Sequence, residues 1–583
     1  MATHPSPGVY TKIIDLSTYL QEIPGTTGFV PFLSKRGPDN VLQMVTSLQQ
    51  FSDLYTVPNI DEYGKDYGLG KYIAWNHISA SPSFYAMRAT SDDAAYSNAF
   101  ILFYKDSTGE DPIPANVEAL FDRWSDSTGA IIVGHKENVN TKAEIDTILE
   151  STAEDVFAIC AIYPIGRGDS YNDFGFSLAQ SSNTNLWIST AKPWQKVYTF
   201  NIYETQSDGD DVIIESFTVS FDDTATDSSG ESMYIKDVVN KFSKNIRIEI
   251  NTDTLNEWKK SSSADIDVGT DTDIHLYYGS EGALITVDID TGRRVIDTSE
   301  ATNLLTSAYS CLLVNPMTSL VDETLRDLDD VYIPLVYDAG YPQEVKDAAQ
   351  DLVSTIRMDG VLIQDNSDQV SYDATILNRN NINVINSKYC SIFEEFSKVY
   401  DVHTGKDIWV SPVYHMASMI PNNDNLYEVW YANAGFNRGT INGIKELRYS
   451  PNQDQRDQLY LKQINPIVKF SGNYVVWGNL TSQNMPSSLQ DLNVMRMVLY
   501  VQRALEQFCK YFVFEMNDMF SWNQVTNSIS PFLESVKSRR GLVSYSVDVG
   551  ATEYEFTHKI MHVNVILQPM KVVERIELNL LIK

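Results

Sequence analysis

The stretch from Val331 to Ile363, VYIPLVYDAGYPQEVKDAAQDLVSTIRMDGVLI, decides the fold class. Its first six residues form an apolar run of the buried-strand type, and Gly360 to Ile363 form a second such run. Between them, after Pro342, apolar residues recur at the spacing of one helix face, at Val345, Ala349, Leu352 and Ile356. A strand, a helix and a second strand in this order predict a sheet with crossover helices.

Similar signals extend on both sides of this stretch. Residues 25–35 and 43–56 predict a strand, a loop and a short helix. Further strand signal is found at residues 71–88, 99–104, 382–385 and 408–410. In residues 101–300, strand-like runs alternate with Ser, Thr, Asp and Gly clusters, which predicts one or two β-rich domains.

Residues 487–540 predict two helices. The first has Ser487 or Ser488 as a candidate cap and an apolar stripe at Val494, Val498, Val501, Leu505 and Phe508. The second has apolar positions at Val525, Ile529, Phe532 or Leu533, and Val536, and ends in Lys537, Ser538, Arg539, Arg540 and Gly541. Basic residues followed by glycine are typical of a helix C-terminus. Strands are predicted after it at 542–548 and 561–567.

Both ends of the sequence are β-prone. Pro5, Pro7 and Gly8 prevent a helix, and residues 9–16 predict an extended arm or an edge strand. The last residues alternate strictly, with one apolar face made of Ile576, Leu578, Leu580 and Ile582. The neighbour of this terminal strand could belong to the same chain or to another chain.

The charge is large and unevenly distributed. The 583 residues (65.8 kDa) suggest about three or four domains. They include 44 basic and 77 acidic residues, a net charge of −33. This excess argues against a general nucleic-acid-coating role and against docking on anionic membranes. Residues 101–300 have a net charge of −21 and residues 451–583 have +1, which predicts a solvent-facing middle and an end that faces a partner.

The four cysteines are Cys160, Cys311, Cys390 and Cys509, too far apart in sequence for a local zinc or redox motif, so we expect reduced thiols. Met1 to Gly8 lacks the features of a secretory signal, and no apolar run is long enough to span a membrane. The sequence therefore predicts a soluble protein made in a cytoplasm.

Matches to catalytic and metal-binding motifs are weak. His558 and His562 are four residues apart but lack the glutamate of a zinc-protease helix, and Gly68-Leu69-Gly70 is not followed by the third glycine of a dinucleotide loop. The calcium-loop pattern fails at Gly269 and Thr270, although four acids lie around them at Asp265, Asp267, Asp271 and Asp273. Arg167-Gly168-Asp169 matches an integrin-type recognition sequence, and Asn479 begins a glycosylation sequon. We interpret both as chance matches. We therefore predict no enzyme activity, no cofactor and no metal site.

Several motifs together resemble those of one protein family. They are Ser6-Pro7-Gly8-Val9-Tyr10 with Asp15-Leu16-Ser17, Asn433-Ala434-Gly435-Phe436-Asn437-Arg438-Gly439, Asp457 to Tyr460, Ile464 to Ile467, Val475 to Thr481, Asn493 to Arg496, and the end from Val547 through Gln568-Pro569 to Ile576. In this order and spacing they are similar to the tail sheath proteins of contractile-tailed bacteriophages, a family that includes R-type pyocin sheaths. The resemblance covers about 330–583 and the first 20 residues; residues 101–300 match less well, and Asn479-Leu480 departs from the usual pair after the glycine.

The resemblance implies a structural subunit. Such subunits assemble as stacked hexameric rings around an inner tail tube, between baseplate and tail terminator proteins, and contract to drive the tube through the host envelope. Their terminal arms exchange β-strands with neighbouring subunits to form a helical polymer. The implied location is the virion tail, assembled in the bacterial host cytoplasm. No binding of nucleic acid or membrane by the chain itself is implied.

We therefore predict an α+β, multidomain chain with a mixed α/β sheath core, an inserted acidic β-rich outer region and extended N- and C-terminal β arms. The predicted parts are an N-terminal arm (1–20), core (21–100), inserted outer domains (101–300), α/β core (301–485), tube-proximal domain (486–572) and C-terminal arm (573–583). The predicted inter-subunit strand residues are Val9, Tyr10, Ile13, Ile14, Ile576, Leu578, Leu580 and Ile582, and the alternative for each is an ordinary internal edge strand.

Lys537, Arg539 and Arg540 are candidate tube-facing residues, and the alternative is a solvent-exposed cap on the helix dipole. The alternative for the whole chain is an acidic surface adhesin or carbohydrate-binding particle protein, because the acidic β-rich middle also fits such a module.

Overall fold

The computed structural model describes residues 26–63, 68–91, 93–104, 120–128, 131–151, 156–181, 192–206, 209–261, 268, 274–280, 285–287, 294–296, 325 and 327–575. The predicted arm strands, at Val9 to Leu16 and Ile576 to Ile582, lie outside these residues. So do Cys311 and the aspartates between Asp265 and Asp273.

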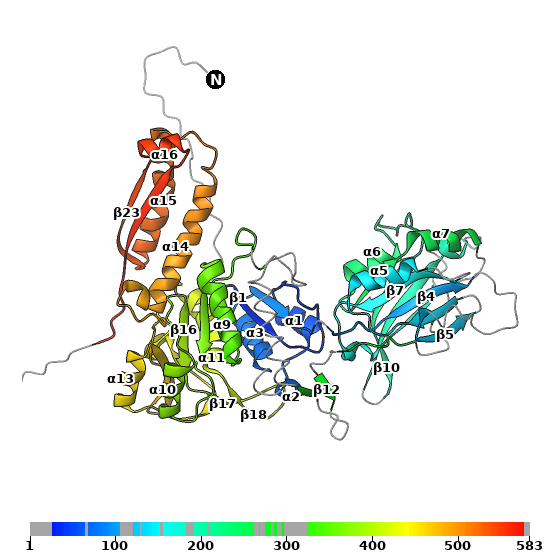
Figure 1. Ribbon diagram of the computed structural model, residues 1–583, viewed down its shortest axis with the longest axis horizontal. Helices are drawn as coiled ribbons and strands as arrows, with labels where there is room; N and C mark the ends of the chain where they lie inside the picture. Colours follow the sequence, from blue (N-terminus) through cyan, green and yellow to red (C-terminus); the bar gives the residue numbers. More distant parts are fainter. Residues whose placement is uncertain are drawn as a thin grey trace, which may run out of the picture.

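A nine-stranded sheet in the described residues forms the centre of the fold, in the order β19-β22-β21-β16-β15-β14-β1-β3-β2 (Figure 1). Its strands are β1 (Gly28–Phe32), β2 (Gln43–Val45), β3 (Phe84–Arg88), β14 (Leu335–Tyr337), β15 (Val361–Asp365), β16 (Cys390–Glu394), β19 (Thr440–Ile441), β21 (Ile464–Phe470) and β22 (Asn473–Val476). Neighbours from β21 to β3 are parallel, whereas β2, β22 and β19 join antiparallel. The chain leaves this sheet after β3 and returns to it at β14.

Helices connect and cover these strands. They are α1 (Leu48–Tyr55), α2 (Ile60–Tyr63), α3 (Leu69–Ala80), α9 (Gln343–Asp351), α10 (Tyr372–Asn381), α11 (Pro412–Leu426), α12 (Gly435–Arg438) and α13 (Gln453–Leu461). The helix predicted after Pro342 is confirmed as α9, and a π-helical segment, η6 (Leu352–Arg357), extends it. Together with β14 and β15 it forms the predicted strand–helix–strand unit.

The strand signal at 71–80 was misleading, because these residues lie in α3. Tyr72, Ile73 and Trp75 favour strands by propensity, but α3 packs between the sheet and α11 and buries most of its circumference. The strand expected at 382–385 is also wrong: these residues follow α10, and the next strand of the sheet is β16. The strand at 408–410 exists as β18 (Asp407–Val410), but in a separate sheet with β17 (Ser397–Tyr400) and β20 (Ile444–Leu447).

Between β3 and β14 the chain builds a separate α/β body, to the right in Figure 1. It contains a five-stranded sheet, β11-β7-β4-β6-β5, and a three-stranded sheet, β10-β9-β8. The strands are β4 (Ala99–Tyr104), β5 (Arg123–Thr128), β6 (Ile131–His135), β7 (Val156–Pro164), β8 (Phe174–Gln180), β9 (Val197–Thr205), β10 (Asp211–Ser220) and β11 (Ile246–Ile250). The helices are α5 (Lys142–Glu150), α6 (Ile235–Phe242) and α7 (Thr252–Ser261), with short turns η1 (Asp169–Tyr171) and η2 (Pro193–Gln195). The same stretch of chain also forms a small pair of strands, β12 (Ile285–Val287) and β13 (Arg294–Ile296), which lies beside α2 and not in this body (Figure 1).

The C-terminal part is a helical hairpin backed by a strand hairpin, at the upper left of Figure 1. It consists of η7 (Ser488–Gln490), α14 (Leu492–Lys510), α15 (Met519–Ser538), β23 (Leu542–Gly550), α16 (Glu553–Thr557) and β24 (His562–Pro569). Both helices and both strands are confirmed. Val525, Ile529, Leu533 and Val536 form the buried stripe of α15. Ser487 caps η7, whereas α14 begins at Leu492, with Asp491 as its N-cap residue.

The prediction of a multidomain chain that mixes helix and sheet is thus confirmed. None of the described helices is long and apolar enough to cross a bilayer.

Candidate functional site

The glycine-rich motif at 433–439 forms a compact turn between α11 and β19, with the short helix α12 at its centre. Gly435 has a φ of 76°, and a Cβ on Gly439 would lie 2.7 Å from the Ala434 Cα. The Arg438 guanidinium lies over the rings of Tyr427 and Tyr431, at 5.6 and 5.1 Å, and donates to the Ala432 carbonyl. Both glycines are therefore required by the shape of the turn, and the arginine holds the turn against aromatic rings.

The second motif, Val475 to Thr481, is joined to the start of α14 by a chain of amides. Asn479 Nδ2 donates to Asn493 Oδ1 over 2.6 Å, and Asn493 Nδ2 donates to the Trp430 carbonyl over 3.0 Å. On the other side, Gly478 packs so closely on Asn465 that a Cβ would come within 2.6 Å of its Oδ1. These contacts explain why separate sequence motifs lie together. The Asn479 sequon is buried, which leaves no room for a glycan.

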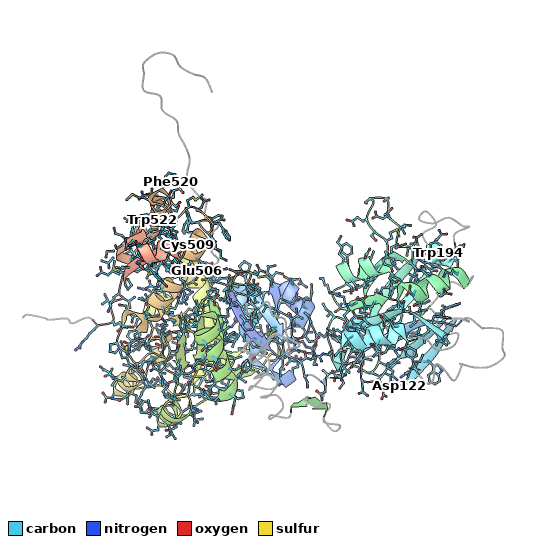
Figure 2. The ribbon with its side chains drawn as sticks, turned by 45° about the horizontal axis from the view of Figure 1, so that its top comes forward. Asp122, Trp194, Glu506, Cys509, Phe520 and Trp522 are labelled. Atoms are coloured by element: carbon cyan, nitrogen blue, oxygen red, sulfur yellow. The ribbon has the colours of Figure 1, made fainter. Side chains whose placement is uncertain are left out.

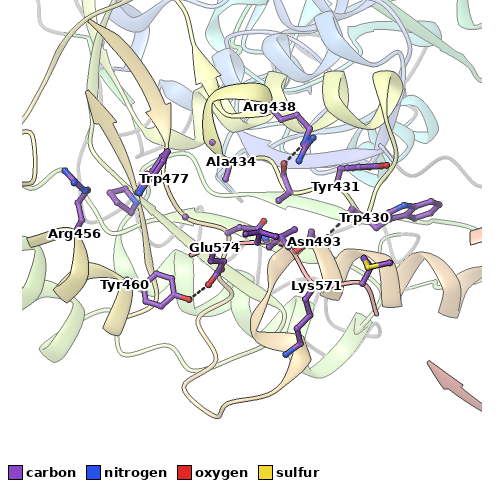
Figure 3. A pocket seen from close by; sticks show the side chains of 18 of the residues that line it. Trp430, Tyr431, Ala434, Arg438, Arg456, Tyr460, Trp477, Asn493, Lys571 and Glu574 are labelled. Atoms are coloured by element: carbon purple, nitrogen blue, oxygen red, sulfur yellow. Dashed lines mark hydrogen bonds between the residues drawn. The ribbon is translucent and has the colours of Figure 1, made fainter. Parts of the chain in front are cut away.

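The motifs surround a cavity of about 810 Å³ at the base of the helical hairpin (Figure 3). We call it the basal pocket. It is lined by Trp430, Tyr431, Ala432, Ala434, Gly435, Arg438, Gln453, Arg456, Asp457, Tyr460, Pro466, Trp477, Gly478, Asn479, Asn493, Arg540 and the segment Met570 to Glu574. The Tyr460 hydroxyl donates to the Glu574 carboxylate over 2.7 Å. The segment leading to the C-terminus therefore crosses the family motifs at this pocket.

The three candidate tube-facing residues lie near the same base. Lys537 Nζ is 3.3 Å from Glu534, and Arg539 Nη1 is 2.8 Å from Glu428. Arg539 also lies 5.2 Å from the Trp430 ring centroid. Arg540 is exposed, has a φ of 70° and lines the basal pocket. Two of the three are thus engaged within the chain, and a role of any of them at a tube stays a prediction.

The carboxyl ends of the central parallel strands hold buried charges. Lys346 lies between Asp338, which follows β14, and Asp365, which ends β15; its Nζ is 3.1 Å from the Asp338 carboxylate and also pairs with Asp365. Burial raises the pKa of Asp338 to about 6, and the two carboxylates raise the pKa of Lys346 against the opposing effect of burial. This edge is the usual ligand site of open α/β sheets. Here an internal ion cluster occupies it.

Two further acids lie buried at the end of β16. Burial raises the pKa of Glu394 to about 8 and that of Glu395 to about 10. Thr375 Oγ1 donates to Glu394 over 3.1 Å and bonds to the Tyr449 hydroxyl at 2.8 Å. Burial in the core therefore favours the protonated form of both acids at pH values where an exposed glutamate is ionised.

The weak sequence motifs behave as chance matches where the structure describes them. Arg167 is buried and donates to Asp39 over 2.6 Å, so the Arg-Gly-Asp sequence is not presented to a receptor. His562 Nδ1 lies 2.8 Å from Glu555. Within the described residues, no group of three or more His, Cys, Asp or Glu side chains could hold a metal ion.

Sequence reasoning missed one surface, at the other end of the helical hairpin. The loop between α14 and α15 and the loop around α16 expose many large apolar side chains. The run YFVFEMNDMF at Tyr511 to Phe520, between two helices, was the signal that could have indicated it.

Comparison with known proteins agrees with the motifs. No family model matches the chain. A sheath tail protein from Listeria innocua has the same fold, with a TM-score of 0.53 over 94% of this chain and 92% of that chain, at 7% identity. The fold is thus that of a sheath protein.

Proteins with a similar sequence are also named as sheath proteins. The chain is 31% identical to the tail sheath protein of Enterobacteria phage T4 over 169 residues. This matched stretch covers 29% of this chain and 26% of that protein. The chain is 30% identical over 168 residues to the tail sheath protein of Vibrio phage KVP40, which covers 29% and 25%. The resemblance to tail sheath proteins is therefore confirmed. The matched part spans about a quarter of the length of these curated relatives.

Proposed function

We propose that the protein is a structural, non-enzymatic subunit of a contractile tail sheath. It polymerises as stacked hexameric rings around an inner tail tube, between baseplate and terminator proteins, and its contraction drives the tube through the host envelope. The observation that carries this proposal is the sequence match to tail sheath proteins of phages, together with the shared sheath fold.

The segment that leads to the C-terminus supports assembly by strand exchange. It is held at the basal pocket by the bond from Tyr460 to Glu574. In this proposal the β-prone residues 576–582 continue from that anchor to a neighbouring subunit. Residues Val9 to Leu16 form the corresponding arm at the N-terminal end of the sequence and pair with another neighbour. Backbone hydrogen bonds hold such strands with little dependence on side-chain identity.

The charge distribution fits this orientation. The inserted body lies away from the C-terminal hairpin (Figure 1), and residues 101–300 have a net charge of −21. On the outside of a sheath, this charge would keep particles apart. The near-neutral residues 451–583 would face subunits and tube in the virion tail, after assembly in the host cytoplasm.

Contraction in this proposal is a rigid-body rearrangement of the subunit bodies, with the arms as flexible links. Its driving force is extra contact between bodies. Each additional 100 Å² or so of buried apolar surface contributes about 2.5 kcal/mol. Summed over many subunits, such a gain could drive a tube through an envelope without nucleotide.

Electron microscopy of the purified full chain tests the proposal. We expect long, hollow, striated tubes in negative stain, whereas monodisperse particles at high concentration would contradict it. Deleting residues 573–583 should leave a folded monomer that forms no tubes. Normal tubes from this truncation would contradict the arm assignment but not the sheath assignment.

A further inference from the structure

The free end of the C-terminal hairpin carries a cluster of exposed apolar side chains, which we call the apolar tip. Its members come from the α14–α15 loop with the first turn of α15, and from α16 with the residues after it, and are Tyr511, Val513, Phe514, Met516, Met519, Phe520, Tyr554, Phe556 and Ile560. Asn517 joins the loops, because its Nδ2 donates to the Ile560 carbonyl over 3.0 Å and its Oδ1 accepts from Trp522 Nε1 over 2.7 Å. Figure 2 shows Phe520 and Trp522 together at this end. Soluble surfaces rarely expose so many large apolar side chains in one place unless a partner covers them.

Phe514 is the most exposed member. Its side chain is fully accessible, and its φ of 75° lies in the left-handed region that bulky residues rarely adopt. The fold therefore accepts backbone strain to present an aromatic ring to solvent. A ring presented in this way is the kind of residue that anchors an interface by entering a pocket.

The charges around the tip favour a basic partner. Glu515, Asp518 and Glu553 are exposed there, with Lys559 as an opposing charge. The complementary surface would be a cavity with aromatic walls and a basic rim.

The basal pocket has this chemistry. Its walls include Trp430, Tyr431 and Trp477, and it has four cationic and two acidic lining residues: Arg438, Arg456, Arg540, Lys571, Asp457 and Glu574. Arg438 and Arg456 lie over aromatic rings of their own chain and donate to backbone carbonyls, whereas Arg540 and Lys571 are exposed and supply the basic rim. Its volume of about 810 Å³ is enough to admit aromatic side chains.

The tip cannot reach the pocket of its own chain. Asn493 lines the pocket at one end of α14, and Tyr511 begins the tip at the other end. Eighteen residues of helix separate them by about 27 Å. A contact between tip and pocket therefore joins two copies head to tail, and repeated head-to-tail contacts build rings or open helical polymers.

We propose that the apolar tip of one subunit docks, with Phe514 as its anchor, into the basal pocket of a second copy of this chain. The proposal deepens the sheath assignment, since it rests on self-assembly and names the surfaces that meet. The Met side chains of the tip are flexible and can repack, which suits a contact that must persist or reform while the bodies move.

Photo-crosslinking of the full chain tests this contact. Phe514 is replaced by p-benzoylphenylalanine, which keeps an aromatic ring at this position, and isotopically light and heavy chains are mixed before assembly and irradiation. We expect light–heavy links from residue 514 to peptides that line the basal pocket. The same probe at the exposed Val370 is the matched control and should give no such links. Links within one chain, links to another segment, or links to a tube protein in co-assembled tails would overturn the proposal.

Charge reversal supplies a second test. Glu515→Lys with Glu553→Lys in the tip, or Arg540→Glu with Lys571→Glu in the pocket, should each weaken association at least tenfold in sedimentation velocity. The two variants mixed together should associate again, because each wild-type tip meets a wild-type pocket and each reversed tip meets a reversed pocket. Asp223→Lys with Glu446→Lys, also exposed acids, should leave association unchanged. If the mixture of the tip variant and the pocket variant does not associate, the proposed contact between tip and pocket is wrong.

The two proposals fail differently. Striated tubes without links from residue 514 to the pocket would overturn the tip contact and leave the sheath assignment intact. Links in short oligomers that never form tubes would support the contact and count against the sheath.

Discussion

The hydroxyl of Tyr460 in α13 donates to the carboxylate of Glu574, five residues after the end of β24, over 2.7 Å. This bond joins the α/β core to the segment that leads to the C-terminus. Since both groups are partly exposed, its contribution to global stability is small, but it restricts the direction in which the chain leaves the pocket.

Tyr460→Phe should release this segment without unfolding the protein. We expect a thermal midpoint within about 1 °C of the wild type, because the ring stays in place and only about 1 kcal/mol of hydrogen bonding is lost locally. Hydrogen exchange of a peptide covering 570–575 should become faster. Tyr400→Phe, at an exposed tyrosine in β17 outside both the apolar tip and the basal pocket, is the control, and equal exchange in all three proteins would contradict the anchoring role.

Arg496 and Asp424 fasten the helical hairpin to the core. Their side chains are 2% exposed, and Arg496 Nη1 donates to Asp424 Oδ1 over 3.0 Å, with a second bond from Nη2 to Oδ2. Arg496→Met leaves the Asp424 carboxylate buried without its partner, which typically costs about 3–5 kcal/mol. Urea denaturation should show this loss as a lower midpoint. Arg539→Met, at an exposed pair with Glu428, should cost under about 1 kcal/mol, and similar losses in both variants would contradict the argument.

Gly478→Ala tests the close contact within the second motif. A Cβ there would lie 2.6 Å from Asn465 Oδ1 and 2.9 Å from its Cα, so the Asn465 amide that bonds Leu480 must move. We expect a loss of about 1–3 kcal/mol in unfolding free energy. At Gly550 the added methyl meets only the His562 ring at an ordinary 3.5 Å, so Gly550→Ala serves as the comparison. A larger loss at 550 than at 478 would show that this contact is not the cause.

The local elements were largely predictable, because short-range patterns determine them. The stripe of Val525, Ile529 and Val536 repeats at helical spacing and is buried as expected. Helix α3 was missed because Tyr72 and Ile73 favour strands, and only packing on both sides, a tertiary effect, makes this segment helical.

The site was harder to predict than the elements. The motifs at 433–439 and 475–481 were visible in the sequence, but their convergence with Tyr460, Asn493 and Glu574 depends on strand order across the sheet. The apolar tip was missed for a different reason. An aromatic run between two helices resembles core sequence, and only the structure shows that the loops place it in solvent.

The buried acids of β16 make stability depend on pH. Burial raises the pKa of Glu394 to about 8 and of Glu395 to about 10, above the ordinary value of 4.5 that they recover on unfolding. Between pH 4.5 and about 8 the folded state therefore keeps a proton on Glu394 that the unfolded state has lost, and between pH 4.5 and about 10 it keeps one on Glu395. The stabilisation that these two protons give is complete below about pH 4.5 and declines as the pH rises. It is fully lost once the pH has passed about 8 for Glu394 and about 10 for Glu395.

Urea midpoints at pH 6 and pH 9 measure this dependence. The wild type should lose on the order of a few kcal/mol between them. In the double variant Glu394→Gln and Glu395→Gln, which carries neutral side chains at every pH, the two midpoints should lie closer together. The double variant Glu446→Gln and Glu534→Gln, at exposed acids, should keep the wild-type difference. An unchanged difference in the buried-site variant would show that other groups cause the alkaline loss.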